Sequence, residues 1–333
     1  MKFQNHIGLD IGSKSIKLVQ LSEAGNGKFN LVVLGQTPTP PEEKDKAQVI
    51  RQLVKDSRAT AKQVVISLPE SQVFTRVIEM PQLLEPELTQ AIKWQAEQYV
   101  PVPLPDVILK HQVLSQENNK MNVLLVAAPN KILNDSANLL GRAGLETVAI
   151  ETEILAVARA IVGADQYSPV TLLVHLGSET TTLSVLARGD LALTQPVSTG
   201  GSAIARAVAA ELGLEIGQAE EYKRSYGLDE TKLEGKVVTA IKPIIELVLA
   251  EVKRVLAFYE THAGTEGPVK RVVLSGGTAL LPGLVSYFTQ SLNLEVQVGD
   301  PFLSVNLTPE QHKEVGEEGP LYATAVGLAM KLT

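Results

Sequence analysis

The sequence predicts an α/β protein of two duplicated lobes, with a compact α+β subdomain inserted between them along the chain. Three observations lead to this fold class. Strands and helices alternate along most of the chain, as in layered α/β folds. A strand–turn–strand pattern near the N-terminus recurs about half a chain later, which indicates internal duplication. The block between the two copies, 70–150, packs strands and helices into a short span and is typical of a separate α+β unit.

Composition limits the possible classes of protein. The chain has 333 residues, 44% of them apolar and 20% charged, which is ordinary for a folded protein of about two domains. The net charge of −7 disfavours nucleic-acid binding. Cysteine is absent, which excludes disulfides and cysteine-based metal sites and fits a reducing compartment. Asp10 falls where a signal peptide would need an apolar run, so we expect a cytoplasmic protein.

The first lobe, expected over 1–69, begins as a meander of three strands. Its second turn, EAGNGK, carries glycines and an asparagine that tolerate tight backbone geometry. A proline-rich link, TPTPPEEK, then leads into a helix and a β-rich run. The predicted elements are strands over 5–11, 15–22 and 29–36, a helix over 46–57 and a strand over 64–69.

The insert, expected over 70–150, mixes short strands with two helices. Pro86 occupies a position that proline favours in the first turn of a helix, and PVPLP ends that helix. The predicted elements are strands over 73–80, 107–114, 122–128 and 146–150, and helices over 86–100 and 130–143.

The second lobe, expected over 151–333, repeats the meander and then turns largely helical. Its most apolar run, 237–260, carries charges at Lys242, Glu246 and Glu251 among others, so it cannot span a bilayer and is typical of a core helix. The predicted strands are 171–177, 181–189, 191–197, 271–277 and 294–299, and the predicted helices are 151–163, 201–213, 216–226, 237–262, 281–292 and 320–331.

The duplicated motif is the stretch IGLDIGSKSIKLVQL at 7–21. Shifted by 165 residues, it aligns with LLVHLGSETTTLSV, so that Gly12 meets Gly177 and Ser13 meets Ser178. Taken alone, each copy is typical of an ordinary β-hairpin turn. Two copies in order favour phosphate binding, because glycine lets the backbone approach closely while N–H groups and hydroxyls donate hydrogen bonds.

Charged residues beside the first turn extend this interpretation. Asp10 ends the first strand, where it would face Mg²⁺ through water, and Lys17 on the return strand would reach a phosphate oxygen. A third glycine cluster, VVLSGGTALLPGL at 272–284, would lie against a base and ribose. Neither GxxxxGK[ST] nor GxGxxG occurs, so the P-loop and Rossmann fingerprints are missing.

The motifs DIGSKSIK, LGSETT, STGG, AEEYK and LSGGTALLPG, in this order, resemble the actin-like ATPase superfamily with its ribonuclease H-like fold, and FtsA within it. Three longer segments are most similar to the PilM family of type IV pilus assembly proteins: SLPESQVFTRVIEMPQL, AIKWQAEQYVPVPL and GGSAIARAVAAELGLEIGQAEEYKRSYG. The resemblance covers essentially the whole chain and implies that 70–150 is the insert subdomain that FtsA and PilM share.

The resemblance also implies an ATP site with Mg²⁺ held through water by Asp10. Its residues fall in the two phosphate motifs, in a glycine pair beside the nucleotide, in an AExxK pattern on the ribose and adenine side, and in an adenosine motif. They are Asp10, Gly12, Ser13, Lys14, Ser15, Lys17, Gly177, Ser178, Glu179, Thr180, Gly200, Gly201, Glu220, Lys223, Gly276, Gly277 and Thr278.

Two residues depart from the pattern of the superfamily. His175 stands where relatives usually carry an aspartate, and Glu179 stands where PilM proteins tend to have a small residue. A neutral imidazole is a poor ligand for hard Mg²⁺, and a carboxylate repels a γ-phosphate. We therefore expect ATP binding with at most weak hydrolysis, and His175 to be a buried, hydrogen-bonded histidine. Glu153 is a weak candidate for positioning water, and the interpretation we favour is an acid at a helix N-terminus.

The resemblance to PilM implies a cytoplasmic scaffold that holds the N-terminal tail of the inner-membrane protein PilN between the first lobe and the insert. Other pilus-assembly proteins and a further copy of the chain are additional candidate partners. YATAVGLAMKLT lacks the basic amphipathic helix of FtsA, so membrane contact would be indirect. Trp94 and Tyr99 could border a peptide site, but we expect them to pack inside the insert. A filament-forming ATPase like FtsA or MreB, a small-molecule kinase and a nucleotide-free scaffold are the alternatives.

Overall fold

The first lobe is built on a six-stranded sheet in the order β14-β3-β2-β1-β4-β8. The computed structural model describes residues 3–117, 119–163, 168–262 and 266–333. β1–β2–β3 form an antiparallel meander, and β4 and β8 add to β1 in parallel. The elements are β1 (Ile7–Ile11), β2 (Ser15–Gly25), β3 (Lys28–Pro38), α1 (Glu43–Asp56), β4 (Gln63–Leu68), α3 (Asn130–Ala143), β8 (Glu146–Thr152) and β14 (Val305–Asn306).

The second lobe repeats this topology around a five-stranded sheet in the order β11-β10-β9-β12-β13. Its meander is again antiparallel, and β12 and β13 again add in parallel. The strands are β9 (Thr171–Leu176), β10 (Thr181–Ala187), β11 (Asp190–Val197), β12 (Arg271–Ser275) and β13 (Glu295–Val298). The helices are α5 (Gly201–Leu212), α6 (Ile216–Tyr226), α7 (Lys236–His262) and α8 (Leu284–Leu292). The predicted duplication is therefore confirmed.

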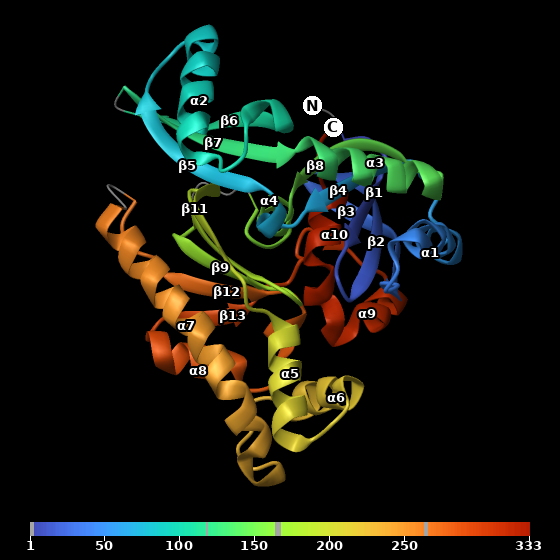
Figure 1. Ribbon diagram of the computed structural model, residues 1–333. Helices are drawn as coiled ribbons and strands as arrows, with labels where there is room; N and C mark the ends of the chain where they lie inside the picture. The colour runs from blue at the N-terminus through green and yellow to red at the C-terminus, as the bar shows by residue number, and fades with distance from the viewer. Residues whose placement is uncertain (1–2, 118, 164–167, 263–265) are drawn as a thin grey trace.

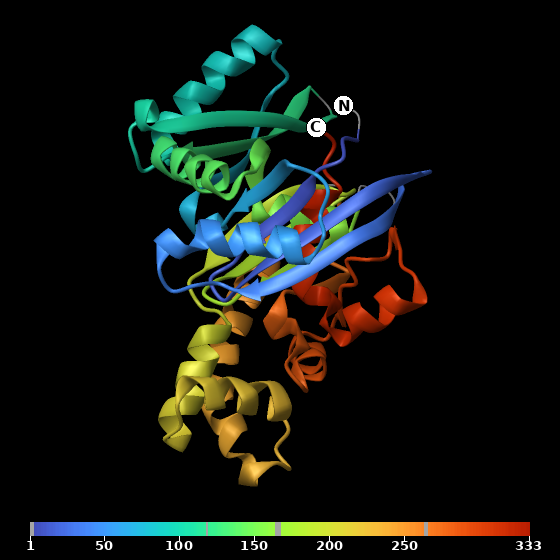
Figure 2. The ribbon, with the colours of Figure 1, turned by 90° about the vertical axis from the view of Figure 1, so that its right-hand side faces the viewer.

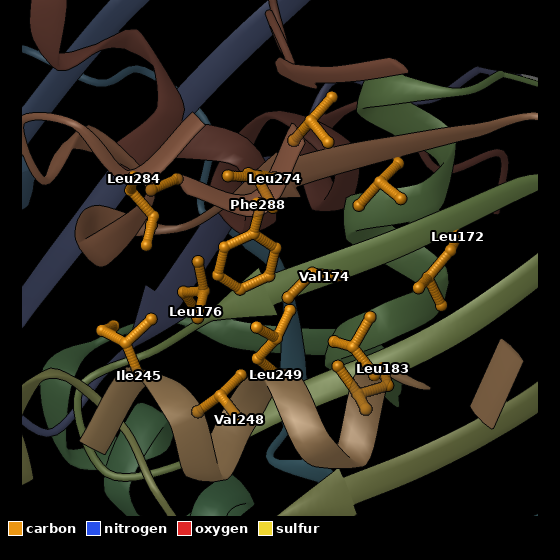
Figure 3. Packing of buried hydrophobic residues seen from close by; sticks show 14 of the residues in the cluster. Leu172, Val174, Leu176, Leu183, Ile245, Val248, Leu249, Leu274, Leu284 and Phe288 are labelled. Atoms are coloured by element: carbon orange, nitrogen blue, oxygen red, sulfur yellow. The ribbon is translucent and has the colours of Figure 1, made fainter. Parts of the chain in front are cut away.

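The two sheets and their helices form layers (Figure 1). α1 and α3 cover the outer face of the first sheet, and α5, α7 and α8 cover the outer face of the second. Two helices, α4 (Glu153–Ile161) and α10 (Ala323–Ala329), lie between the lobes, with α4 packing on β9 and β12 and α10 on β1 and β2. In the second core, Phe288 of α8 lies among Leu176 of β9, Leu274 of β12 and Leu249 of α7 (Figure 3).

Two glycines allow the backbone of α10 to approach α4 and strand β1 of the first sheet closely. A Cβ added at Gly327 of α10 would lie 1.8 Å from the carbonyl oxygen of Ala156 in α4. A Cβ added at Gly8 of β1 would lie 2.2 Å from the carbonyl oxygen of Ala325. Glu151 at the end of β8 also receives a bidentate pair of hydrogen bonds from Arg159, at 2.7 and 2.8 Å. α4 is thus fixed tightly at the boundary between the lobes.

The insert is a three-stranded antiparallel sheet, β5-β7-β6, covered by one helix, and it projects from the end of the first lobe (Figure 2). Its elements are the 3-10 helix η1 (Glu70–Gln72), β5 (Phe74–Pro81), α2 (Glu85–Tyr99), η2 (Leu104–Asp106), β6 (Val107–Glu117) and β7 (Lys120–Pro129). α3 and β8, which we expected within the insert, instead contribute to the core and the sheet of the first lobe. The physical reason is that β8 pairs with β4 and not with an insert strand.

One side chain of the insert differs from expectation. Trp94 on α2 is 61% exposed, so the prediction that it packs inside the insert is wrong. Tyr99 does pack locally, with the guanidinium of Arg76 3.9 Å from its ring centroid. Trp94 therefore offers its apolar surface outward.

The C-terminal region contains two elements that we did not predict. These are β14 and α9 (Pro309–Val315). The second half of the chain also contains the 3-10 helices η3 (Leu233–Gly235), η4 (Gly277–Leu280) and η5 (Gly316–Tyr322). η5 and α10 replace the single predicted helix over 320–331. In the described residues, no helix combines the length and apolar character needed to cross a bilayer.

Candidate functional site

The two duplicated turns have the same backbone geometry. In the first, the Gly12 N–H donates to the carbonyl oxygen of Ser15 at 3.1 Å. In the second, the Gly177 N–H donates to the carbonyl oxygen of Thr180 at 3.0 Å. A Cβ at either glycine would lie 2.9 or 2.8 Å from that same carbonyl oxygen. Both turns therefore require glycine for the same steric reason, as expected for two copies of one motif.

Sheet topology explains why the turns meet. β1, β4 and β8 are parallel neighbours, so residues at their carboxyl ends gather at one edge of the first sheet. Asp10 lies near the end of β1, and Glu153 follows β8 directly. β9 and β12 are likewise parallel in the second sheet, and His175 and Ser275 are register partners near their ends.

The first turn carries a buried ion pair. Asp10 and Lys17 are register partners on β1 and β2, and Lys17 Nζ lies 3.2 Å from Asp10 Oδ2. Both residues are less than a tenth exposed. Burial raises the pKa of the Asp10 carboxyl and the charge of Glu153 raises it further, while the charge of Lys17 opposes both. Lys17 thus lies beside the first turn with Asp10 as its partner, and its role toward phosphate stays a prediction.

Glu153 and His175 link the two lobes. His175 Nε2 lies 3.4 Å from Glu153 Oε1, and His175 Nδ1 lies 3.2 Å from the Ser275 hydroxyl. A neutral imidazole satisfies both contacts, because Nε2 donates to the carboxylate while Nδ1 accepts from the hydroxyl. Burial alone would raise the pKa of Glu153, but the hydrogen bond from His175 and the charge of Lys17 hold it below its ordinary value.

His175 is therefore a buried, partnered histidine, as expected. Glu153 is the first residue of α4, which fits the helix-terminus interpretation, yet its carboxylate also contacts the second lobe. Sequence analysis missed Ser275 as the residue that orients the imidazole. Its position immediately before the Gly276–Gly277 turn was the available clue.

A second contact crosses between the lobes on the other side of the turns. Lys14 in the first turn lies 3.9 Å from Glu220 on α6, and Glu220 also pairs with Lys223 at 2.5 Å. The two turns are thus on one shared boundary and not on opposite surfaces. We call Asp10, Lys14, Lys17, Glu153, His175 and Glu220 the inter-lobe site.

The second turn is fastened to the start of α5. The N–H groups of Gly201 and Ser202 donate to the carbonyl oxygens of Gly177 and Ser178 at 2.9 and 2.8 Å. The Ser202 hydroxyl donates to Glu179 Oε1 at 2.6 Å. Glu179 is therefore directed to the beginning of a helix, where a negative charge is favourable. This placement stabilises the Glu179 carboxylate at the second turn.

The glycine pair at 200–201 lies against the adenosine motif at 276–278. A Cβ at Gly201 would come within 2.5 Å of Thr278 Oγ1 and 3.3 Å of Lys223 Nζ. Gly276 has φ of +82° and a Cβ there would lie 2.5 Å from the carbonyl oxygen of Leu176. Lys223 donates to the carbonyl oxygen of Gly201 at 3.2 Å. These predicted residues are therefore brought together around the second turn.

The remaining predicted residues lie nearby. A Cβ at Gly200 would be 2.6 Å from the carbonyl oxygen of Ser178, and one at Gly277 would be 2.8 Å from Leu321 of η5. Ser13 is exposed at the first turn, and Ser15 and Thr180 begin or precede the return strands.

Binding of Mg²⁺ would depend on the oxygen ligands that a bound phosphate chain supplies. In the part of the chain that the structure describes, no cluster of three or more His, Cys, Asp or Glu side chains could hold a metal ion. Mg²⁺ in nucleotide sites keeps several waters and takes its other ligands from phosphates and one or two carboxylates. Asp10 therefore fits a role toward Mg²⁺ only together with a bound phosphate chain.

Comparison with known proteins gives consistent results. The family model described as "Type IV pilus assembly protein PilM" matches residues 8–333. The chain is 22% identical to the cell division protein FtsA of Bacillus subtilis (strain 168), over 97% of this chain and 82% of that protein. It is similar to a solved structure named "PilM-PilN type IV pilus biogenesis complex", with 29% identity, a TM-score of 0.85 and 98% of each chain covered. MreB 5 of Spiroplasma citri bound to AMPPNP gives 13% identity and a TM-score of 0.52, over 98% of this chain and 95% of that one.

Proposed function

The chain belongs to the family of the type IV pilus assembly protein PilM and has the actin-like ATPase fold, and on that premise we propose that it is an ATP-binding scaffold of pilus assembly. The observation that carries the proposal is the pair of equivalent turns on one boundary between the lobes, with Gly12 and Gly177 in the same hydrogen-bonded geometry. Two such turns can hold a phosphate chain from both sides. MreB 5, a protein of the same fold, was solved with the ATP analogue AMPPNP.

Each part of the inter-lobe site has a role in this proposal. Lys17 would bind a phosphate oxygen, and Asp10, which pairs with Lys17 in this structure, would hold Mg²⁺ through water. The hydroxyls of Ser13, Ser15, Ser178 and Thr180 add donors. Mg²⁺ would offset phosphate charge when bound. The adenosine side is formed by the glycine pairs with Thr278, Glu220 and Lys223, which already lie together around α5 and α6.

A nucleotide phosphate bound at the first turn would compete with Glu220 for Lys14. The Lys14 side chain is 52% exposed and the pair is 3.9 Å apart, so the contact contributes at most about 1 kcal/mol. Phosphate is a stronger partner for Lys14 than the Glu220 carboxylate, because it carries more charge. The contact is therefore readily exchanged for a ligand.

We propose that hydrolysis is slow. A water molecule attacking the γ-phosphate reacts faster when a side chain, often a carboxylate, orients it and accepts its proton. Glu153 shares its Oε1 with His175, and His175 stands where the resemblance to the superfamily implies an aspartate. The inter-lobe site therefore supports binding better than turnover.

The partner we propose is the N-terminal tail of a PilN-like inner-membrane protein, because the solved relative is a PilM–PilN complex. β8 is the outermost strand of the first-lobe sheet and lies on the side of the insert (Figure 1). Five of its seven residues are half-buried, which leaves an accessible edge for an added extended peptide. Attachment to the inner membrane would follow through this partner.

Titration calorimetry with Mg·ATP tests the nucleotide part of the proposal. Wild-type protein should bind, and Lys17→Met should bind at least about tenfold more weakly. Lys120→Met should bind as wild type does, because the Lys120 side chain is 63% exposed at the β6–β7 hairpin of the insert. No binding by the wild type would instead favour the nucleotide-free scaffold. Electron microscopy with Mg·ATP would detect the filament-forming alternative.

A further inference from the structure

Helix α6 of the second lobe meets two other segments through charged side chains on one of its faces. Glu220 of α6 lies 3.9 Å from Lys14 of the first turn. Arg224 of α6 donates from Nη2 to Glu318 Oε1 of η5 at 3.3 Å. Residues four positions apart lie on the same face of a helix, so both contacts belong to one surface of α6. The charges are in opposite order, with an acid of α6 in the first contact and a base of α6 in the second.

Glu318 is shared between the two lobes. Its Oε1 accepts from Arg224, and its Oε2 accepts from Gln36 Nε2 on β3 at 3.2 Å. η5, which carries Glu318, packs with the first lobe, because Tyr322 at its end lies in one core cluster with Leu31 of β3. Each carboxylate oxygen thus has one donor, and the two donors come from different lobes. We call Gln36, Glu318 and Arg224 the Glu318 bridge.

η5 also contacts the adenosine motif. A Cβ at Gly277 would lie 2.8 Å from Leu321 Cδ2, so η5 packs closely on the turn that follows β12. Leu321 is three residues after Glu318 in the same short helix. The Glu318 bridge therefore stands beside both elements of the second lobe that the proposed function assigns to adenosine, which are α6 and the turn at 276–278.

The two contacts of α6 should respond differently to a nucleotide. Lys14 and Glu220 belong to the inter-lobe site, where a phosphate would compete for Lys14. The Glu318 bridge contains none of the residues that the proposed function assigns to the nucleotide. It can therefore persist while a nucleotide is bound, and α6 then stays attached to the first lobe through Glu318.

We propose that Glu318 is a positioning residue: it ties α6 to the first lobe beside the nucleotide, and so opposes separation of the lobes and slows nucleotide release. The role in release rests on the proposed function. The Arg224 side chain is 66% exposed and that of Glu318 is 46% exposed, so loss of the bridge should change a rate by about three- to fivefold.

Spin labels measure the tie in the ligand-free protein. The chain has no cysteine, so Gln48→Cys on α1 and Glu211→Cys on α5, both at exposed positions, can be labelled selectively. Double electron–electron resonance should give one main distance between the two labels when no other residue is changed. Arg224→Glu brings two carboxylates together and should add a longer distance. A distance distribution that R224E leaves unchanged would overturn the proposal.

Charge reversal separates the bridge from a general effect of charge. Glu318→Arg should act as R224E does, and the double variant R224E/E318R should restore the single distance, because the Gln36 amide can accept a hydrogen bond as well as donate one. Arg254→Glu on α7 is the matched control, since Arg254 is 67% exposed and pairs with Glu251 of its own helix. A double variant no closer to the wild type than R224E would also overturn the proposal.

Stopped-flow release of a fluorescent ATP analogue, in the presence of Mg²⁺, tests the role in the site. Release should be at least about threefold faster in R224E and in E318R, and within about twofold of wild type in R224E/E318R and in R254E. Equal release from the wild type and R224E would overturn the role in release. A wild type that binds no analogue contradicts the proposed function instead, and the spin-label measurement tests the tie by itself.

Discussion

Replacing Glu70 by Gln should change how the stability of the protein depends on pH. Burial raises the pKa of the Glu70 carboxyl from 4.5 to about 7, and the negative charge of Glu153 adds to this rise. Between pH 4.5 and about pH 7, the Glu70 carboxyl keeps its proton in the folded state and releases it in the unfolded chain. Stability therefore falls as pH rises from about 4.5, and the loss is complete above about pH 7.

The size of the change in stability follows from the difference between the two pKa values of Glu70. At about 1.4 kcal/mol per pH unit, the rise from 4.5 to about 7 corresponds to about 3 kcal/mol, which is the unfavourable contribution of Glu70 at pH 8. Glutamine does not ionise, so Glu70→Gln removes this contribution. Part of this contribution is already present at pH 5, so the difference in unfolding free energy between E70Q and the wild type should increase by about 2.5 kcal/mol, in favour of E70Q, from pH 5 to pH 8.

Urea denaturation of both proteins at pH 5, 6, 7 and 8 measures this difference. Asp10, Glu151 and Glu153 also titrate, but they are present in both proteins, so their contributions largely cancel in the comparison. Glu79→Gln, at an exposed side chain, is the control and should show no such slope. A difference between E70Q and the wild type that stays flat from pH 5 to pH 8, or that falls, would refute the reasoning.

Three further substitutions test other parts of the fold and the site. Gly327→Ala places a methyl group 1.8 Å from the Ala156 carbonyl oxygen by the geometry above, and should lower the unfolding free energy by about 3 kcal/mol in urea denaturation. Phe288→Ala empties the centre of the second-lobe core, where the side chain is fully buried, and should lower it by about 3–5 kcal/mol; a loss below about 1 kcal/mol would contradict the packing. His175→Asp frees Glu153 and restores a carboxylate at the second turn, so Mg·ATP hydrolysis measured by phosphate release should rise at least about tenfold, and an unchanged rate would count against the assigned role.

The duplicated architecture could be predicted from the sequence because, in both meanders, the strand pattern and the glycine turn are local features of consecutive residues. Gly12 and Gly177 were identifiable from spacing alone, and the structure gives them one geometry. The buried state of His175 was also predictable, since it follows an apolar strand run.

Other features depend on pairing partners that no local pattern encodes. β8 joins β4 and not the insert, so the assignment of 130–152 needs the tertiary structure. β14 is two residues long and leaves no periodicity to detect. α9 did have a local indicator, since Thr308 begins a capping box with Gln311 and proline follows at the first helical position.

Some contacts in the candidate site likewise depend on tertiary structure and could not be predicted from local sequence. Ser275 reaches His175 only because the parallel strands β9 and β12 end side by side, which sequence spacing does not reveal. The orientation of Glu179 toward Ser202 likewise depends on how α5 packs against the second turn.

Amide exchange at Gly12–Lys14 and at Gly177–Thr180, measured with and without Mg·ATP, tests most directly whether two matched bends enclose one phosphate chain. The account predicts that both segments become protected together, at the same nucleotide concentration, and that Lys17→Met weakens both responses equally. Protection of one segment without the other, or of neither at a concentration that saturates binding, would contradict it.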